Sequence, residues 1–356
     1  MMMHMKRITI FIALAFLLFA CDDFTKGKKG GALATGKPGE VLVVCTDDLW
    51  NSGEIDSLIY ALAKEEEPYY PLEYAFKFYQ KNAGGFNHIH KKVRNILIIQ
   101  QQNNAQFSPA KVEFVRDKWV KGQLVTEVTF KEKADLLQVA KYDAEKIAHR
   151  FEESEIDRIV EANRLAKMKP LAKKIYEKYG VYLDFPSGSE VKSDKDIFLR
   201  IDIPERSREM KLDGGPAYET QRANFILSSW LMWQVDYTKK EQLEPKNLLH
   251  TQDSILKIYA PHHKEGAYMA TEYDSLVYPV SQVFEYNDLY TVEIKGQYRM
   301  NGRDDVFMGG PFVSYSFVHP KTNKLITMFG MVHGPSEPLI NYIREHKGLF
   351  RTLHLE

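Results

Sequence analysis

The sequence predicts an α+β fold built from two α/β-type regions, the second a mostly antiparallel sheet with packed helices. In the first part of the chain, short apolar runs alternate with amphipathic segments, whereas runs of strand signals with few helices fill the second part. The chain has 356 residues, of which 44% are hydrophobic and 12% aromatic. This length and apolar content suit about two domains with real cores, and they argue against a disordered chain.

The first region, residues 40–168, alternates strand and helix signals. Short apolar runs predict buried strands, and apolar stripes at helical spacing predict amphipathic helices. The expected strands are residues 41–45, 95–101 and 124–130; helices are expected over residues 51–62 and 137–151, and helical spacing resumes over residues 156–160. Asn51 and Glu54 have the spacing of a capping box at the start of the first helix. Residues 65–85 contain two prolines and many tyrosines, and they predict an irregular connection.

A domain boundary is expected near Met168, and residues 169–356 form the second region. Pro170 opens and Gly180 closes a separate helix, an asymmetry typical of helix ends. The following strand signals cover residues 181–185, 197–201, 225–235, 268–272, 289–298, 311–318 and 324–332, and helical spacing covers residues 248–259 and 339–350. Runs of strands with a few packed helices are typical of the α+β class.

Residues 1–20 have the pattern of a secretory signal peptide. Lys6 and Arg7 precede an apolar run of 13 residues, whereas a helix that spans a bilayer needs about 20. The run ends in Leu18-Phe19-Ala20-Cys21, which resembles the lipobox of bacterial lipoproteins. That resemblance implies a lipid on Cys21, with acyl chains such as palmitate, and attachment to the outer membrane of a cell envelope. An ordinary signal peptide with a chance cysteine is the alternative, and the membrane face stays open.

Residues 21–39 are rich in glycine and lysine and predict a flexible tether between the lipid and the fold. The only other cysteine, Cys45, lies in the apolar run 41–45. With Cys21 acylated it has no partner for a disulfide, so we expect a buried and unreactive thiol.

The charge balance argues against nucleic acid as the main partner. Removing residues 1–20 takes Lys6 and Arg7 from 48 basic residues, which leaves 46 against 48 acidic residues, or a net charge of −2. Phosphate binding needs a clustered basic excess. Residues 31–38 come within one residue of a nucleotide-binding P-loop, but Pro38 stands where Ser or Thr is needed. We therefore expect neither nucleotide nor another cofactor.

Other motifs for catalysis or metal binding are incomplete. His88-Ile89-His90 and His262-His263 are the close histidine pairs, and no third ligand is spaced near either, so we expect no metal. Residues 334–338 fail the last position of the GxSxG serine-hydrolase motif. Asp304-Asp305 and Glu272 could form a carboxylate pair for glycoside chemistry, which requires the two acids to be about 5–10 Å apart.

Met308, Gly309, Gly310 and Pro311 form the most unusual local sequence and stand between two expected strands. Two glycines allow positive φ or close backbone approach, so the segment predicts a tight turn or bulge, with a binding loop as the alternative. Arg94 enters a strand, where we expect it to pair with a carboxylate rather than capture a ligand. Trp230 and Trp233 should face opposite sides of one strand, one of them in the core and the other available for an exposed binding patch.

Several segments in order along the chain resemble a family of Bacteroidetes lipoproteins defined only as a domain of unknown function. They are residues 36–44, Trp50, Phe86-Asn87, residues 94–98, 266–272 and 307–314. The sequence departs from the family at Val93, where a histidine is expected before the arginine. The resemblance implies a lipoprotein at the periplasmic or outer surface and brings no activity or catalytic residues. Residues 170–356 are also similar, by fold analogy, to the PsbP-like α+β sandwich.

These observations favour a non-enzymatic envelope lipoprotein that binds or docks a protein or a small ligand, held to the membrane through Cys21. The alternative is a hydrolase of envelope polymers that uses paired carboxylates. An enzyme should show a deep cleft with converging titratable groups, and a docking module should show an exposed apolar patch. A carrier of apolar ligands, the third hypothesis, needs an enclosed apolar cavity.

Overall fold

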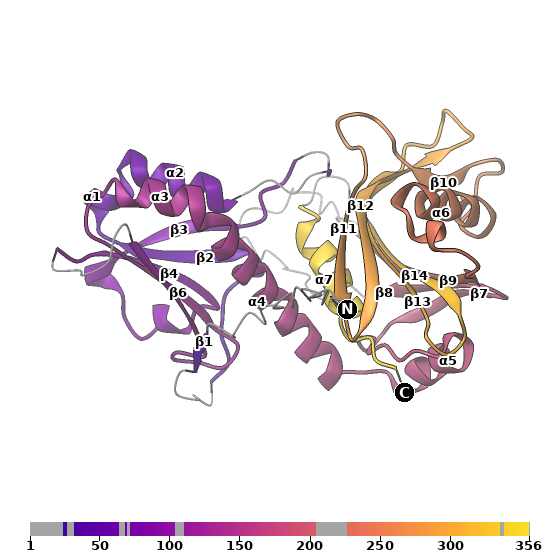
Figure 1. Ribbon diagram of the computed structural model, residues 1–356, viewed down its shortest axis with the longest axis horizontal. Coiled ribbons are helices and arrows are strands. Elements are labelled where there is room, and N and C mark those ends of the chain that lie inside the picture. The colour runs from indigo at the N-terminus through magenta and orange to yellow at the C-terminus, as the bar shows by residue number, and fades with distance from the viewer. Residues whose placement is uncertain are drawn as a thin grey trace, which may run out of the picture.

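The computed structural model describes residues 24–26, 32–63, 68–69, 72–103, 110–203, 226–334 and 338–355. Two β-sheets, each with its own helices, make up an α+β protein (Figure 1), which confirms the expected fold class. None of the helices in these residues combines the length and the apolar character that crossing a bilayer requires.

The first sheet has six strands in the order β1-β5-β6-β4-β2-β3. The strands are β1 (Phe24–Lys26), β2 (Glu40–Cys45), β3 (Lys77–Asn82), β4 (Asn95–Gln101), β5 (Ala110–Arg116) and β6 (Leu124–Phe130). Neighbours from β6 to β3 run parallel, whereas β5 is antiparallel to β6. Among the described strands, β3 is one edge of this sheet and β1 is the other.

Helices cover one face of this sheet. They are α1 (Asp47–Trp50), α2 (Gly53–Ala63), α3 (Asp135–Tyr142) and α4 (Ala144–Leu165). The alternation of side chains along β2 sends Val41, Val43 and Cys45 into the core beneath these helices. Leu42 and Val44 face the other side, which the loop containing the short 3-10 helices Ala83–Gly85 and His90–Lys92 helps to cover. Cys45 is buried, as expected, and burial raises the pKa of its thiol to about 11.

The second sheet has eight strands, all paired antiparallel, in the order β10-β12-β13-β14-β9-β8-β7, with β11 also pairing β12. The strands are β7 (Glu190–Lys195), β8 (Phe198–Ile203), β9 (Leu227–Asp236), β10 (Tyr268–Thr271), β11 (Val280–Tyr286), β12 (Leu289–Asn301), β13 (Gly309–Val318) and β14 (Lys324–His333). Asn287 and Asp288 both have positive φ and form the two-residue turn between β11 and β12.

Both faces of the second sheet are covered. Helices α5 (Lys169–Tyr179) and α7 (Ile340–Phe350) pack on one face, and α6 (Pro245–Tyr259), preceded by the 3-10 helix Lys240–Leu243, packs on the other. Trp230 and Trp233 lie on opposite faces as expected, but they are 0% and 1% exposed, so the expectation of one exposed tryptophan is wrong. The reason is that each face of this sheet has its own helices.

Five strands and one extended segment differ from the sequence-based expectation; one of these strands, β1, lies in the stretch expected to be a tether and pairs with β5. Strands β3, β5, β7 and β11 were not predicted, because partly exposed polar residues break their apolar pattern. Residues 181–185 are largely buried but form no regular strand, since only Tyr182 makes a bridge, to His354. Asn51 caps the C-terminus of α1 rather than opening α2, which begins at Gly53.

Two helices connect the halves of the molecule. In Figure 1, α4 runs from the first sheet toward the second, and α7 lies between the two sheets. Three ion pairs join these helices or the residue after α7: Glu152 with Arg344, Glu152 with Lys347, and Glu153 with Arg351. The two sheets are therefore held together by buried or half-buried charged contacts as well as by apolar packing.

Candidate binding site

A cavity of about 830 Å³ lies between α2 and the edge strand β3 in the first half of the molecule. Its wall is mainly aromatic and aliphatic, with three charged side chains. The lining residues are Glu40, Trp50, Ile55, Asp56, Ile59, Tyr60, Ala63, Tyr74, Phe76, Lys77, Phe78 and Tyr79. We call this the α2–β3 cavity. Its volume and composition are typical of ligand pockets, which measure about 300–1,000 Å³ and are mostly apolar.

The cavity follows the edge of β3 rather than one of its faces. Side chains alternate between the two faces along a strand, yet the consecutive residues from Phe76 to Tyr79 all line the cavity. Phe78 packs with the helix-covered core, whereas Tyr79 pairs in register with Leu42, which faces the other side. The opening of the cavity therefore lies along the outer side of β3.

Three aromatic side chains at the cavity are exposed in the structure. Tyr60 on α2 is 78% exposed, and Tyr74 and Tyr79 are 55% and 39% exposed. Burial and the nearby charge of Glu40 raise the pKa of the Tyr79 phenol. The tyrosine is therefore neutral at physiological pH and can donate a hydrogen bond to a ligand. Large amphipathic side chains of this kind supply much contact area at binding sites.

The second half of the molecule fixes the segment that leads into β3. Both carboxylate oxygens of Glu73 accept a hydrogen bond from Leu339 N at 2.8 Å, and one also accepts from Ile340 N, so Glu73 caps the N-terminus of α7. Arg344 on α7 donates to Ala75 O at 2.6 Å, and its guanidinium lies 4.7 Å from the centre of the Phe76 ring. Tyr74, between these anchored residues, is thereby held at the cavity.

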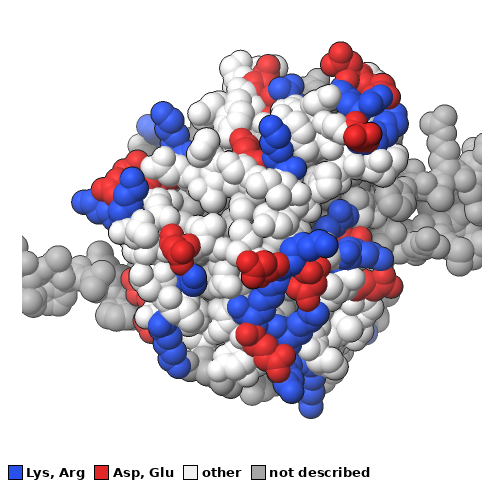
Figure 2. Space-filling view, turned by 90° about the vertical axis from the view of Figure 1, so that its right-hand side faces the viewer, with Lys and Arg blue, Asp and Glu red and all other residues white. Residues whose placement is uncertain are grey.

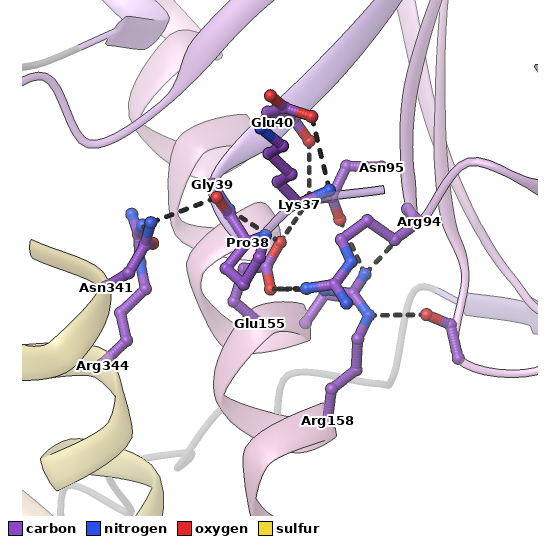
Figure 3. A network of polar contacts seen from close by, with 12 residues as sticks. Lys37, Pro38, Gly39, Glu40, Arg94, Asn95, Glu155, Arg158, Asn341 and Arg344 are labelled. Carbon is purple, nitrogen blue, oxygen red and sulfur yellow. Dashed lines mark hydrogen bonds and ion pairs between the residues drawn. The ribbon is translucent and has the colours of Figure 1, made fainter. Parts of the chain in front are cut away.

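A buried polar network holds the turn that precedes β2 (Figure 3). Glu155 on α4 accepts hydrogen bonds from Gly39 N at 3.2 Å, from Asn95 Nδ2 at 2.7 Å and from Arg94 Nη1 at 3.0 Å. Arg158 approaches the same carboxylate at 3.1 Å. Gly39 adopts a φ of 74°, and a Cβ there would lie 3.0 Å from Arg344 Nη1, so glycine is required. Arg94 thus has the carboxylate partner expected from the sequence.

This network is structural and belongs to the support of the cavity. Burial lowers the pKa of Arg158, an effect that the negative charge of Glu155 opposes. Asn341 on α7 donates to Pro38 O at 3.2 Å, so the turn is held by both α4 and α7. Lys77 N in turn donates to Gly39 O at 2.8 Å. The network consequently sets the position of β3 through the turn at Gly39.

The histidines, the carboxylates and the segment 308–311 that the sequence offered as candidate site residues do not line the α2–β3 cavity. Cys21 and the expected signal peptide lie outside the described residues, so lipidation remains a prediction. Part of the expected tether contacts the body, because Leu33 bridges to Lys121 and Thr35 to Val93.

Most of the segment from Met308 to Pro311 forms strand rather than a turn or loop, and Met308 directly precedes the strand. Gly309, Gly310 and Pro311 are the first residues of β13 and pair with β12. Neither glycine has positive φ; instead, a Cβ on Gly310 would lie 2.0 Å from Val332 O. Close approach of the neighbouring strand therefore explains the glycine, and a binding role for Met308, Gly309, Gly310 and Pro311 stays a prediction.

The histidine pairs do not form a metal site with other described residues, among which no group of three His, Cys, Asp or Glu side chains is placed to hold an ion. His90 lies in a 3-10 helix, so it does not share a strand face with His88. The rings of His262 and His263 lie 3.9 Å apart, and burial, together with electrostatic effects of His263 and Lys264, lowers the pKa of His262. Residues 335–337 of the incomplete GxSxG motif lie outside the described residues.

Two of the carboxylates considered for hydrolysis, Asp305 and Glu272, are bound to basic side chains. Asp305 pairs with Arg303 at 2.7 Å and with Lys264 at 3.0 Å, and these hydrogen bonds lower the pKa of Asp305. Glu272 pairs with Arg299 at 3.2 Å. A general acid needs a raised pKa near the working pH, which is the opposite of the shift at Asp305.

Sequence reasoning missed the α2–β3 cavity. The signal was present in the cluster of Tyr74, Phe76, Phe78 and Tyr79, which lies in the stretch interpreted as an irregular connection. Aromatic residues at alternate positions indicate a half-buried strand. Their role in a cavity depended on the position of α2, which the pattern of this segment does not contain.

Figure 2 shows the outer end of the second half. Acidic and basic side chains lie next to one another there in mixed clusters, separated by uncharged surface. This face carries no broad patch of one charge, in keeping with the overall balance of 48 basic and 48 acidic residues. A nucleic-acid surface needs a concentrated basic patch.

Two family models match the chain. The model for a domain of unknown function, DUF4837, matches residues 168–352, and the model for another, DUF8532, matches residues 34–164. No curated protein matches the chain.

Several solved structures resemble the chain distantly. The cyanobacterial PsbP (CyanoP) from Synechocystis sp. PCC 6803 has 10% identity and a TM-score of 0.30, with 50% of this chain and 87% of that chain covered. The Ran-binding protein Mog1p of Saccharomyces cerevisiae has 8% identity and a TM-score of 0.30, covering 49% and 90%. A protein from Bacteroides thetaiotaomicron has 6% identity and a TM-score of 0.24, covering 50% and 45%. Likeness at this level carries no argument about function.

Proposed function

The chain belongs to the family described as the domain of unknown function DUF4837, and we propose that it is a non-enzymatic, lipid-anchored binding protein of the cell envelope. Its ligand enters the α2–β3 cavity. The observation that supports this proposal is the combination of a cavity of about 830 Å³ with a largely aromatic wall. Apolar walls with a few polar groups are what ligand pockets share across many folds.

The way in which the cavity is supported also favours binding. Preorganised sites bind more tightly, because less side-chain and loop freedom is lost on association. Glu73 and Ala75, on either side of Tyr74, are each hydrogen-bonded to α7. The segment that enters β3 is therefore ordered before a ligand arrives.

Binding of an apolar fluorophore tests the cavity. The protein would be the chain from Asp22 onward, which contains every described residue, and the probe N-phenyl-1-naphthylamine. We expect saturable fluorescence enhancement with one site per chain. Tyr60→Ala should weaken binding about tenfold, since an aromatic wall of the cavity is lost.

Tyr142→Ala is the matched control. Tyr142 is also an exposed helical tyrosine, 66% exposed, and it does not line the cavity. The Tyr142→Ala protein should bind the probe with the same affinity as the wild type. Absence of saturable binding, or equal affinities for the two variants, contradicts the proposal.

The anchor is proposed from the sequence. The run that ends at Ala20-Cys21 resembles a lipobox, and several acyl chains on one cysteine give stable attachment to a membrane. Strand β1, which begins at Phe24, lies at the opposite edge of the first sheet from β3. A lipid on Cys21 would therefore leave the edge with the cavity directed away from the attachment point.

Fractionation of cells tests the anchor. Cys21→Ser should move the protein from the membrane fraction to the soluble fraction and should prevent incorporation of labelled palmitate. A Cys21→Ser protein that stays in the membrane fraction, with no labelled form in the wild type, shows that Cys21 carries no lipid. Cys45→Ser is the control, because Cys45 is buried in the fold.

A further inference from the structure

We propose that the ligand of the α2–β3 cavity is an extended, basic peptide segment that pairs through its backbone with the outer edge of β3. This inference rests on the proposed function, because it names the class of ligand for the same cavity. Three features of the structure support it: an edge with which no described strand pairs, the alternation of the lining side chains, and the charges at the rim.

The first feature is the backbone of β3. Lys77 N donates to Gly39 O at 2.8 Å, and Lys77 pairs in parallel register with Glu40. Peptide groups alternate in direction along a strand, so the N–H and C=O groups of Phe78 and Gln80 point away from β2. The described strands include none on that side. Such an edge is a template for an added strand.

The second feature is the placement of side chains on both sides of this edge. Phe78 faces the side of α2, and Lys77 and Tyr79 face the other side. A strand added beside β3 would direct alternate side chains toward α2 and toward Tyr79. The cavity thus offers a contact surface to both sets of side chains of an extended peptide, whereas a compact ligand would need only one face.

The third feature is charge. Among the described lining residues, Glu40 and Asp56 place two carboxylates at the cavity, and Lys77 places one ammonium group there. Aromatic faces also attract cations, and Trp50 and Tyr60 lie in the same wall. A lysine or arginine side chain of the peptide fits this combination, and an acidic side chain does not.

Synthetic peptides are the probe for this inference. One library has arginine at the centre of an acetylated and amidated heptapeptide, with valine, isoleucine, threonine or tyrosine at the other positions. A second library has glutamate at the centre. We expect members of the arginine library to bind and to displace N-phenyl-1-naphthylamine, with affinities about tenfold above those of their glutamate counterparts.

A pair of variants at one position tests the backbone pairing. Gln80 does not line the cavity, and its side chain donates to Asp47 at 2.8 Å. Gln80→Ala and Gln80→Pro both remove that side-chain contact, but only proline removes the outward N–H group. Proline is tolerated on an edge strand where the N–H faces away from the sheet. We expect Gln80→Ala to bind the peptide within about twofold of wild type and Gln80→Pro about tenfold more weakly.

The same test can be made on the unchanged protein. The peptide groups of the best-binding peptide can be N-methylated in two alternating phases, either at the odd-numbered or at the even-numbered residues. Only one of these two phases faces β3, so methylation of that phase should abolish binding and methylation of the other should not. Equal binding by Gln80→Pro and Gln80→Ala, or equal binding by both N-methylated phases, overturns the inference. Binding of the fluorophore with no peptide bound also overturns it and leaves the proposed function standing. Failure of both probes overturns the proposed function itself.

Discussion

At the scale of single residues, buried charged and polar side chains do most to define the local structure around the cavity. Glu155 accepts hydrogen bonds from a backbone N–H, an amide and a guanidinium, with a second guanidinium beside it. A carboxylate with so many partners is costly to change, since removal of one member of a buried pair costs about 3–5 kcal/mol. Its function is to fix the turn at Gly39, from which β2 begins.

His346 shows a second kind of buried polar group. Its Nε2 lies 3.2 Å from Met331 O and 3.1 Å from Ser228 Oγ, while Nδ1 has no hydrogen-bond partner in the described part of the chain. The carbonyl of Met331 can only accept, so Nε2 carries the proton of the neutral ring. That tautomer cannot take a proton from Ser228, which excludes a serine–histidine catalytic pair in this arrangement.

The burial of His346 predicts a dependence of stability on pH. Desolvation lowers its pKa from 6.5 to about 4 in the folded protein. Between pH 4 and pH 6.5 the unfolded chain binds more protons at this residue than the folded protein does. The contribution of His346 to the free energy of unfolding is therefore fully present above about pH 6.5 and is lost as the pH falls toward 4. Urea unfolding at about pH 7 and pH 5 should show a loss of about 2 kcal/mol in the wild type from this residue.

His346→Gln provides the comparison, because glutamine does not titrate. The variant is expected to be less stable at both pH values, and the measured quantity is the difference between them. The wild type should lose about 2 kcal/mol more than the variant on acidification. Equal losses in the two proteins would show that His346 is not a source of the pH dependence.

At the scale of secondary-structure elements, α4 and α7 connect the two halves. Burial acts to raise the pKa of Glu152 on α4, but the charges of Arg344 and Lys347 on α7 outweigh that effect and lower it to about 2. Arg344 is buried, donates to Glu152 at 2.6 Å and to Ala75 O at 2.6 Å, and so bonds α7 both to α4 and to the segment before β3. The ion pair of Glu152 with Arg344 therefore couples the two sheets through α4 and α7.

Replacement of Arg344 is expected to weaken the coupling between the two sheets. Arg344→Gln leaves Glu152 buried without its closest cation, which should lower the free energy of unfolding by about 3–5 kcal/mol. Hydrogen exchange should show the slowest amides of β2 and β4 opening together with those of β13 and β14 in the wild type. In the variant, the amides of the first sheet should open at lower free energy.

Arg303→Gln is the control, since Arg303 pairs with Asp305 on the exposed turn between β12 and β13. We expect no measurable change in exchange in either sheet, because exposed ion pairs contribute little. Uniform slowing or acceleration of both sheets in Arg344→Gln, with no difference between them, would contradict the proposed coupling.

At the scale of the whole molecule, the two sheets have different tasks. The first sheet ends in an edge strand beside a cavity, whereas the second has helices on both faces and contributes α7 to the support of that cavity. Phe307 at the turn between β12 and β13 is 93% exposed, and Leu276 is 79% exposed. Single exposed apolar side chains are normal on protein surfaces, so they assign no role to the second half.

The sequence by itself determined the fold class and most of the elements. Buried strands such as β2, β4 and β6 have uninterrupted apolar runs, and helices such as α5 and α6 have an apolar stripe with proline near the start. These signals are local, because each depends on the periodicity of one segment. The expected carboxylate partner of Arg94 was also found, since an arginine at the start of a buried strand needs a counter-charge. Lipidation of Cys21 remains a prediction from sequence.

Only the tertiary structure decided where the cavity lies and what supports it. Its wall combines residues of α1, α2, β2 and β3, and its support comes from Glu73 and Arg344, whose bonds span 266 and 269 positions of the chain. Strand β11 was missed because an exposed edge strand lacks the apolar pattern that marks a buried strand, and β3 was missed because the aromatic alternation that ends at Phe78 gives way to polar residues within the strand. The physical reason is that periodicity records which face of an element is buried, whereas a cavity depends on which elements become neighbours.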